Sequence, residues 1–96
     1  MPAPVRDGTT LLEVSREEAW VVHAALMEQL RTAAADRDPD AVEVDALDRL
    51  DDARDRFTLE QVRAIRDALV EYLVDAPLRD RQPGRRALRT ADSALN

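Results

Sequence analysis

The sequence has no cysteine and no lysine, and its only histidine is His23. Without cysteine the chain cannot form disulfides, thiolate zinc sites or a cysteine nucleophile. One histidine is too few for the multi-histidine sites that hold catalytic zinc. The sequence therefore predicts no metal site of these kinds.

Long hydrophobic runs are also missing. No apolar run approaches the roughly 20 residues that a membrane-spanning helix needs, so no membrane partner is expected. Residues 1–7 lack the apolar stretch of a signal peptide, which predicts a cytoplasmic protein. The few glycines form no phosphate loop, dinucleotide fingerprint or nucleophile elbow. We therefore expect a protein that is not an enzyme, with no catalytic residue and no cofactor.

The charge of the 96-residue chain is unevenly distributed. Its net charge is −6, from 20 acidic residues and 14 arginines. Residues 36–55 carry a local charge of −6, whereas residues 77–96 carry +3. An acidic surface without lysine is typical of a salt-rich cytoplasm, because carboxylates hold water and keep the chain soluble. Coding by GC-rich DNA also favours Ala, Arg and Asp over Lys, so a high-GC bacterium is the alternative source.

Three segments show the apolar periodicity of helices. The first is predicted over 15–35, where Ser15 and Glu18 form a capping box. Its apolar face, widened by Trp20 and Met27, is broad enough to need two neighbouring helices. The second is predicted over 41–55, and the third over 58–75, where Thr58 and Gln61 form another capping box. We expect Pro77 to end the third helix.

The two ends of the chain have weaker patterns. Residues 1–14 are predicted to be a flexible or extended lead-in, in which 10–14 form an extended segment without a partner strand. Pro83-Gly84 argue against helix over 78–84, and a short basic helix is expected over 84–95. The predicted fold is all-α: one helical domain over 15–96, with a three-helix bundle and a short basic fourth helix.

Two groups of residues are candidates for binding a partner. Trp20, His23 and Met27 share one face of the first helix, where His23 is expected as a boundary residue of the core. The C-terminal segment carries the only basic cluster, formed by Arg79, Arg81, Arg85, Arg86 and Arg89. We expect these arginines to dock on carboxylates of this protein or of a second copy. The ridge formed by Asp48, Asp51, Asp52 and Asp55 is the matching surface; it is otherwise expected to face water rather than a metal ion.

Three segments of the sequence resemble a known group of proteins. They are Ser15-Arg-Glu-Glu-Ala-Trp-Val-Val-His23, Phe57-Thr-Leu-Glu-Gln61 with Tyr72-Leu73, and Asp75-Ala-Pro-Leu-Arg-Asp-Arg81. Together they resemble small acidic proteins of halophilic archaea that form an uncharacterised domain family. The resemblance implies a salt-rich cytoplasm and implies no activity for any residue.

Three functions remain open from the sequence. The first is a protein-interaction module that binds a protein partner or a second copy of itself. The second is a nucleic-acid-associated regulator that uses the arginine cluster, although the overall negative charge disfavours nucleic acid. The third is a small-molecule binder around Trp20, His23 and Tyr72. The sequence identifies no particular small molecule.

Overall fold

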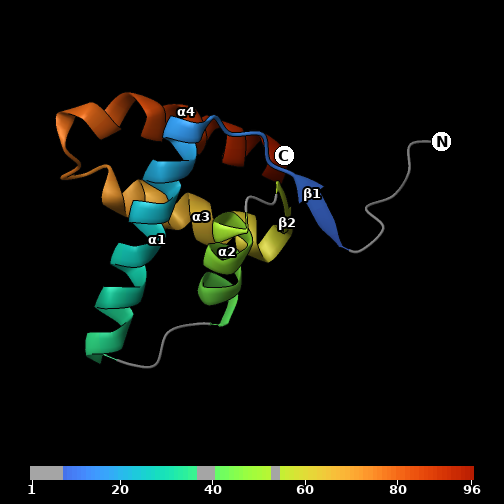
Figure 1. Cartoon of the computed structure of the whole chain (residues 1–96), viewed down its shortest axis with the longest axis horizontal. Coiled ribbons are helices and arrows are strands. Elements are labelled where there is room, and N and C mark those ends of the chain that lie inside the picture. The colour runs from blue at the N-terminus through green and yellow to red at the C-terminus, as the bar shows by residue number, and fades with distance from the viewer. Residues whose placement is uncertain (1–7, 37–40, 53–54) are drawn as a thin grey trace.

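The chain is mostly helical, as the sequence predicts, with a small two-stranded ribbon (Figure 1). The computed structural model describes residues 8–36, 41–52 and 55–96. The elements are β1 (Thr9–Leu11), α1 (Arg16–Asp36), α2 (Ala41–Asp51), β2 (Arg56–Thr58), α3 (Leu59–Tyr72) and α4 (Leu78–Leu95). None of the helices in these ranges is long and apolar enough to span a membrane.

Both predicted capping boxes are present. The Ser15 hydroxyl accepts from the Glu18 backbone N–H at 3.1 Å, and the Glu18 carboxylate accepts from the Ser15 N–H at 2.9 Å. Thr58 and Gln61 exchange the same pair of bonds, at 3.0 and 2.8 Å. These side chains satisfy backbone donors that have no partner inside the helix, which places the starts of α1 and α3.

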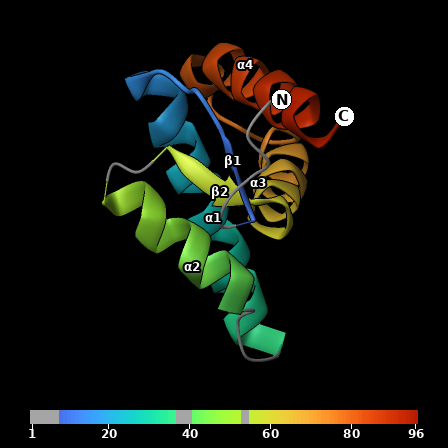
Figure 2. The same ribbon diagram turned by 90° about the vertical axis from the view of Figure 1, so that its right-hand side faces the viewer.

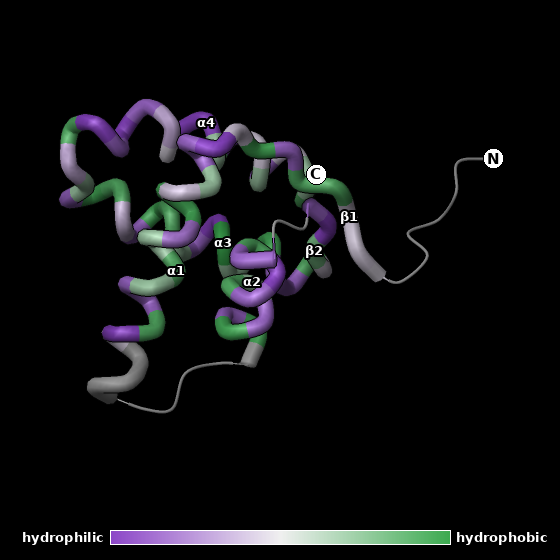
Figure 3. The backbone as a smooth tube through the Cα atoms, in the orientation of Figure 1, coloured by the Kyte–Doolittle hydropathy of each residue, from purple (hydrophilic) through white to green (hydrophobic). Residues whose placement is uncertain are grey.

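The core lies where α1 and α3 pack against each other and against α2 and α4. Hydrophilic and hydrophobic residues are interspersed along the helices (Figure 3). The buried hydrophobic side chains of α1 and α3 make up most of the core. The largest fully buried side chains include Phe57, Leu12, Leu26, Ile65, Leu69, Val22 and Val62. Figure 2 shows α2 and α4 on opposite sides of the molecule.

The prediction that residues 10–14 lack a partner strand is wrong. β1 pairs antiparallel with β2, with Thr10 opposite Phe57, and the ladder continues where Leu12 N–H donates to Asp55 O at 2.7 Å. The partner strand lies more than 40 residues along the chain, so no local pattern announces it. In the sequence, Phe57 and Thr58 appear only as the start of a helix, yet Phe57 is fully buried in this ribbon.

The prediction that Pro83-Gly84 exclude helix over 78–84 is also wrong, because α4 runs unbroken from Leu78 to Leu95 with Pro83 inside it. Proline costs the helix one hydrogen bond. Pro83 and Gly84 are both buried. A Cβ on Gly84 would lie 2.6 Å from Leu73 Cδ2 and 3.2 Å from Val21 Cγ1. Gly84 therefore lets α4 pass close to α1 and α3, and this packing compensates for the weak local propensity.

Helix ends differ from the predictions by a few residues. α2 ends at Asp51 rather than at residue 55, and the chain then returns as β2. α3 ends at Tyr72 rather than at residue 75, with Leu73 as its C-cap. The prediction that Pro77 ends this helix is wrong, because α3 stops before Leu73 and Pro77 instead stands at the N-cap of α4. The predicted flexible residues 1–7 lie outside the described residues.

Candidate functional site

One face of α1 stays exposed although three other helices pack around it. Val21, Val22 and Leu26 turn into the core. On the other side Trp20 is 68% exposed and Met27 is 39% exposed. His23 and Ala24, each partly buried, lie between them. We call Trp20, His23, Ala24 and Met27 the α1 face. The core is thus widened by Val21 and Ala25, and the predicted widening by Trp20 and Met27 does not occur.

His23 is held at the edge of this face by α2. Its Nε2 lies 3.2 Å from Asp51 Oδ1, and its ring meets the Trp20 ring edge-on, with centroids 6.1 Å apart. The two rings and Asp51 border a hollow of about 210 Å³, which Arg16, Ala19 and Leu50 complete. The contact between His23 and Asp51 joins this edge of the α1 face to α2. No cluster able to hold a metal ion is found among the described residues.

Tyr72 does not join this hollow. Its hydroxyl donates to Asp80 Oδ2 at 2.7 Å, and its ring lines a separate hollow beside Ala25 and Gln29 of α1. Burial, followed by the hydrogen bond to Asp80, raises the pKa of the Tyr72 phenol. The three residues nominated for a small-molecule site are therefore not brought together.

The five arginines of α4 have different surroundings. Arg86 Nε donates to Glu18 Oε2 at 3.0 Å, and Arg86 Nη2 lies 3.9 Å from Glu17 Oε2. Arg81 Nε donates to the carbonyl of Ala76 at 3.2 Å, and Arg79 Nε lies 4.0 Å from Asp80 Oδ1. Arg85 and Arg89 are exposed and form no ion pair within the described residues. The cluster is thus partly neutralised by acids of the same chain.

Within one chain, the arginines of α4 meet carboxylates of α1, and no pairing with the aspartate ridge is found among the described residues. Docking on the ridge of a second copy stays a prediction. Asp51 pairs with His23, while Asp48, Asp52 and Asp55 are exposed. α4 lies across the molecule from α2 (Figure 2). Glu18 is buried; this alone would raise its pKa, but hydrogen bonds from the Ser15 backbone and from Arg86 lower the pKa below its usual value. Sequence reasoning used Glu18 only as a capping residue.

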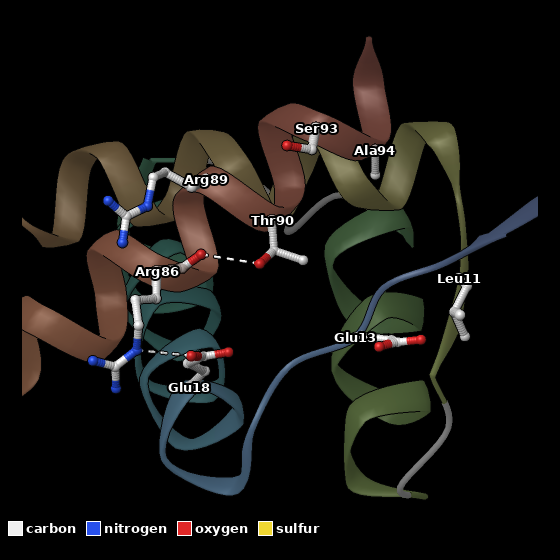
Figure 4. Close-up of a pocket in the computed structure, with 8 residues that line it drawn as sticks. All are labelled: Leu11, Glu13, Glu18, Arg86, Arg89, Thr90, Ser93 and Ala94. Carbon is white, nitrogen blue, oxygen red and sulfur yellow. Dashed lines mark hydrogen bonds and ion pairs between the residues drawn. The ribbon is translucent and has the colours of Figure 1, made fainter.

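A second surface feature was not foreseen. A groove of about 700 Å³ separates α4 from the segment that joins β1 to α1 (Figure 4). We call it the α4 groove; it is lined by Leu11, Glu13, Glu18, Arg86, Arg89, Thr90, Ser93 and Ala94. The two walls come from opposite ends of the chain, so only the tertiary structure brings them together.

Comparison with known proteins gives a family and no activity. Residues 12–92 match the family described as "Family of unknown function (DUF7853)". No curated protein matches the chain. No solved structure matches it either.

Proposed function

The chain belongs to this family of unknown function, and we propose that it is a non-enzymatic protein-interaction module that pairs with a second copy of itself through the α1 face. The observation that carries the proposal is the exposure of Trp20, at 68%, on the face of α1 that points away from the core. Covering a large aromatic side chain with a partner removes apolar surface from water, and tryptophan is among the residues that dominate interface energies.

Charge favours a second copy as the partner. Glu17, Ala24 and Arg31 are spaced seven residues apart on α1, which is close to two turns, so they lie along one line. The side chains of Glu17 and Arg31 are 81% and 71% exposed. An antiparallel copy with its two-fold axis at Ala24 would bring each Glu17 against Arg31 of the other copy. The small Ala24 permits close approach at the axis.

The same arrangement covers the aromatic side chain. Trp20 lies one turn before Ala24, and Met27 lies about one turn after it. Across the two-fold axis, Trp20 would meet Met27 of the second copy, a sulfur–aromatic contact that adds to the apolar area buried. The contact between His23 and Asp51 joins the Trp20 side of the face to α2.

The setting we propose is a salt-rich cytoplasm of a halophile. It is supported by the net charge of −6 and by the absence of lysine. In strong salt, screening reduces the value of surface ion pairs. Association would then depend on Trp20 and Met27, with the charges setting the orientation of the two copies.

The first experiment measures mass by light scattering over a range of protein concentrations. The unsubstituted chain is expected at twice the mass of one chain. Trp20→Ala should weaken the dimer by about 2 kcal/mol, or about 30-fold. Leu59→Ala is the matched control, because it removes an exposed apolar side chain from the start of α3. It should leave the affinity of the dimer unchanged. A chain that stays monomeric, or a Trp20→Ala dimer as tight as the original, would overturn the proposal.

A charge swap tests the orientation. Glu17→Arg and Arg31→Glu should each weaken the dimer in dilute salt, since each places like charges together. The double variant restores opposite charges across the axis and should recover most of the association. If the double variant loses as much free energy of association as the two single variants lose together, the two copies do not pair in this antiparallel register.

A further inference from the structure

We propose that the α4 groove binds an extended acidic peptide, which pairs as an added strand with the outward backbone groups of Leu11 and Glu13. The site is separate from the α1 face and uses different residues, so it does not depend on the proposed dimer. The groove volume of about 700 Å³ is in the range of ordinary ligand sites.

The pairing pattern of the ribbon leaves the backbone groups of Leu11 and Glu13 without a strand partner among the described residues. In an antiparallel pair, alternate residues bond to the partner strand and those between them point the other way. Leu12, just after β1, donates its N–H to Asp55 O, so Thr10, two residues earlier, also directs its backbone groups toward β2. Leu11 and Glu13 consequently direct their backbone N–H and C=O groups away from β2. Both residues line the α4 groove.

The outer edge of β2 is closed by side chains. Arg49 of α2 donates through Nη1 to the carbonyl of Arg56 at 3.0 Å. The backbone N–H of Thr58 donates to Gln61 Oε1 at 2.8 Å. A strand can therefore be added to this ribbon on the β1 side, which is the mode by which exposed sheet edges recognise extended peptides.

The opposite wall of the groove favours carboxylates. Arg86 is fixed by the bond from its Nε to Glu18 (Figure 4). Its Nη2 lies 3.9 Å from Glu17 Oε2, which is an ion pair without a hydrogen bond, so terminal N–H groups of the guanidinium can still donate to a ligand. Arg89 lies less than one turn further along α4, is exposed, and has no ion pair in the described part of the chain. Guanidinium groups bind carboxylates in a planar, two-bond geometry.

The remaining lining residues set the polarity of the occupant. Leu11 and Ala94 give the groove apolar surface for small aliphatic side chains. Ser93 adds a hydroxyl to the α4 wall. Glu13, on the strand wall, repels acids, so the carboxylates of a bound peptide must point toward Arg86 and Arg89. Since successive side chains of a strand point to opposite faces, the fitting sequence alternates acidic and small apolar residues.

The test uses the full chain and a fluorescent peptide of about eight residues, alternating Val and Asp, in roughly 0.1 M salt. Matched peptides replace Asp by Ser, replace Asp by Arg, or carry N-methyl groups on alternate amides. The acidic peptide should bind at least about tenfold more tightly than the others, because only it offers both carboxylates and free amides. Equal binding of the Ser peptide would overturn the charge argument, and equal binding of the N-methylated peptide would overturn strand addition.

Two variants of α4 locate the site. Arg89→Gln should weaken binding about tenfold, whereas Arg85→Gln, an exposed arginine of the same helix outside the groove, should leave it unchanged. Hydrogen exchange at the Leu11 and Glu13 amides should slow when the peptide is bound. The proposal would be overturned if both variants lost the same affinity for the peptide, or if hydrogen exchange at these amides did not change. It would also be overturned if a single-stranded oligonucleotide bound more tightly than the peptide with the same dependence on Arg89. Trp20→Ala should bind the peptide normally, so failure here and failure of the dimer are distinguishable.

Discussion

The carboxylate of Glu18 joins the start of α1 to the middle of α4 through Arg86. One oxygen accepts the backbone N–H of Ser15 at 2.9 Å, and the other accepts Arg86 Nε at 3.0 Å. A single buried side chain thus completes a helix cap and an ion pair between residues 68 positions apart. Because one carboxylate accepts both bonds, the helix start and the helix packing are coupled.

Replacing Glu18 should therefore make the stability of the protein less dependent on pH. The lowered pKa of Glu18 stabilises the fold above the ordinary pKa of a glutamate, and this contribution is lost as the pH falls through the folded-state pKa. Glu18→Gln should cost about 1–3 kcal/mol near neutral pH, and less in acid. Urea unfolding at several pH values measures the difference. Glu60→Gln, at an exposed glutamate in the first turn of α3, is the control. If the stability of the original chain and that of Glu18→Gln depended on pH in the same way, the lowered pKa of Glu18 would be contradicted.

Thr58→Ala should lower the free energy of unfolding by about 1 kcal/mol, because the Thr58 hydroxyl caps the Gln61 N–H. Thermal melts followed by circular dichroism measure the change. Ser93→Ala is a matched control, since the exposed Ser93 hydroxyl forms no hydrogen bond within the described residues. A loss of the same size in both variants would show that the cap is not its cause.

Gly84 and Leu73 should be energetically coupled, because a Cβ at residue 84 would lie 2.6 Å from Leu73 Cδ2. Alanine favours a helix interior over glycine by about 1 kcal/mol, so the clash opposes a gain in propensity. The change in the free energy of unfolding caused by Gly84→Ala should be more favourable by about 1–2 kcal/mol in a Leu73→Ala background than in the original chain. A double-mutant cycle from urea unfolding gives this coupling, and additive effects would argue against the close approach of α4 to Leu73.

Tyr72 should titrate above the ordinary pKa of 10, and its absorbance can be followed alone because the chain has only one tyrosine. Asp80→Asn should lower this pKa part of the way, since burial remains the larger cause. The raised pKa stabilises the fold fully below the unfolded-state pKa, and that contribution is lost as the pH rises through the folded-state pKa. An Asp80→Asn variant with an unchanged titration would refute the hydrogen bond.

Salt should stabilise the protein. Residues 36–55 carry nine acids, and the Debye length falls from about 10 Å at 0.1 M to about 3 Å at 1 M. Raising KCl over this range should therefore raise the melting temperature. A triple variant with Asp45, Asp48 and Asp52, all exposed, replaced by Asn should respond less. An equal response in both chains would mean that repulsion among these acids is not what salt relieves.

The sequence by itself determined the helical character and the starts of α1 and α3. Each capping box joins residues three positions apart, so its geometry is complete within one turn and does not depend on the rest of the chain. The prediction that Trp20 and His23 share a helix face rests on the same local periodicity, and their rings do meet.

Tertiary structure alone decided the strand ribbon, the α4 groove and the course of α4 through Pro83 and Gly84. The ribbon joins Thr9 to Thr58, and the α4 groove joins Glu13 to Arg89; partners so distant leave no local pattern in either segment. Pro83 and Gly84 are poor helix residues locally, yet α4 passes through them because the missing Cβ of Gly84 allows close packing on Leu73 and Val21. Burial against neighbouring helices outweighs local propensity at such a contact, since propensity differences are worth only about 1 kcal/mol per residue.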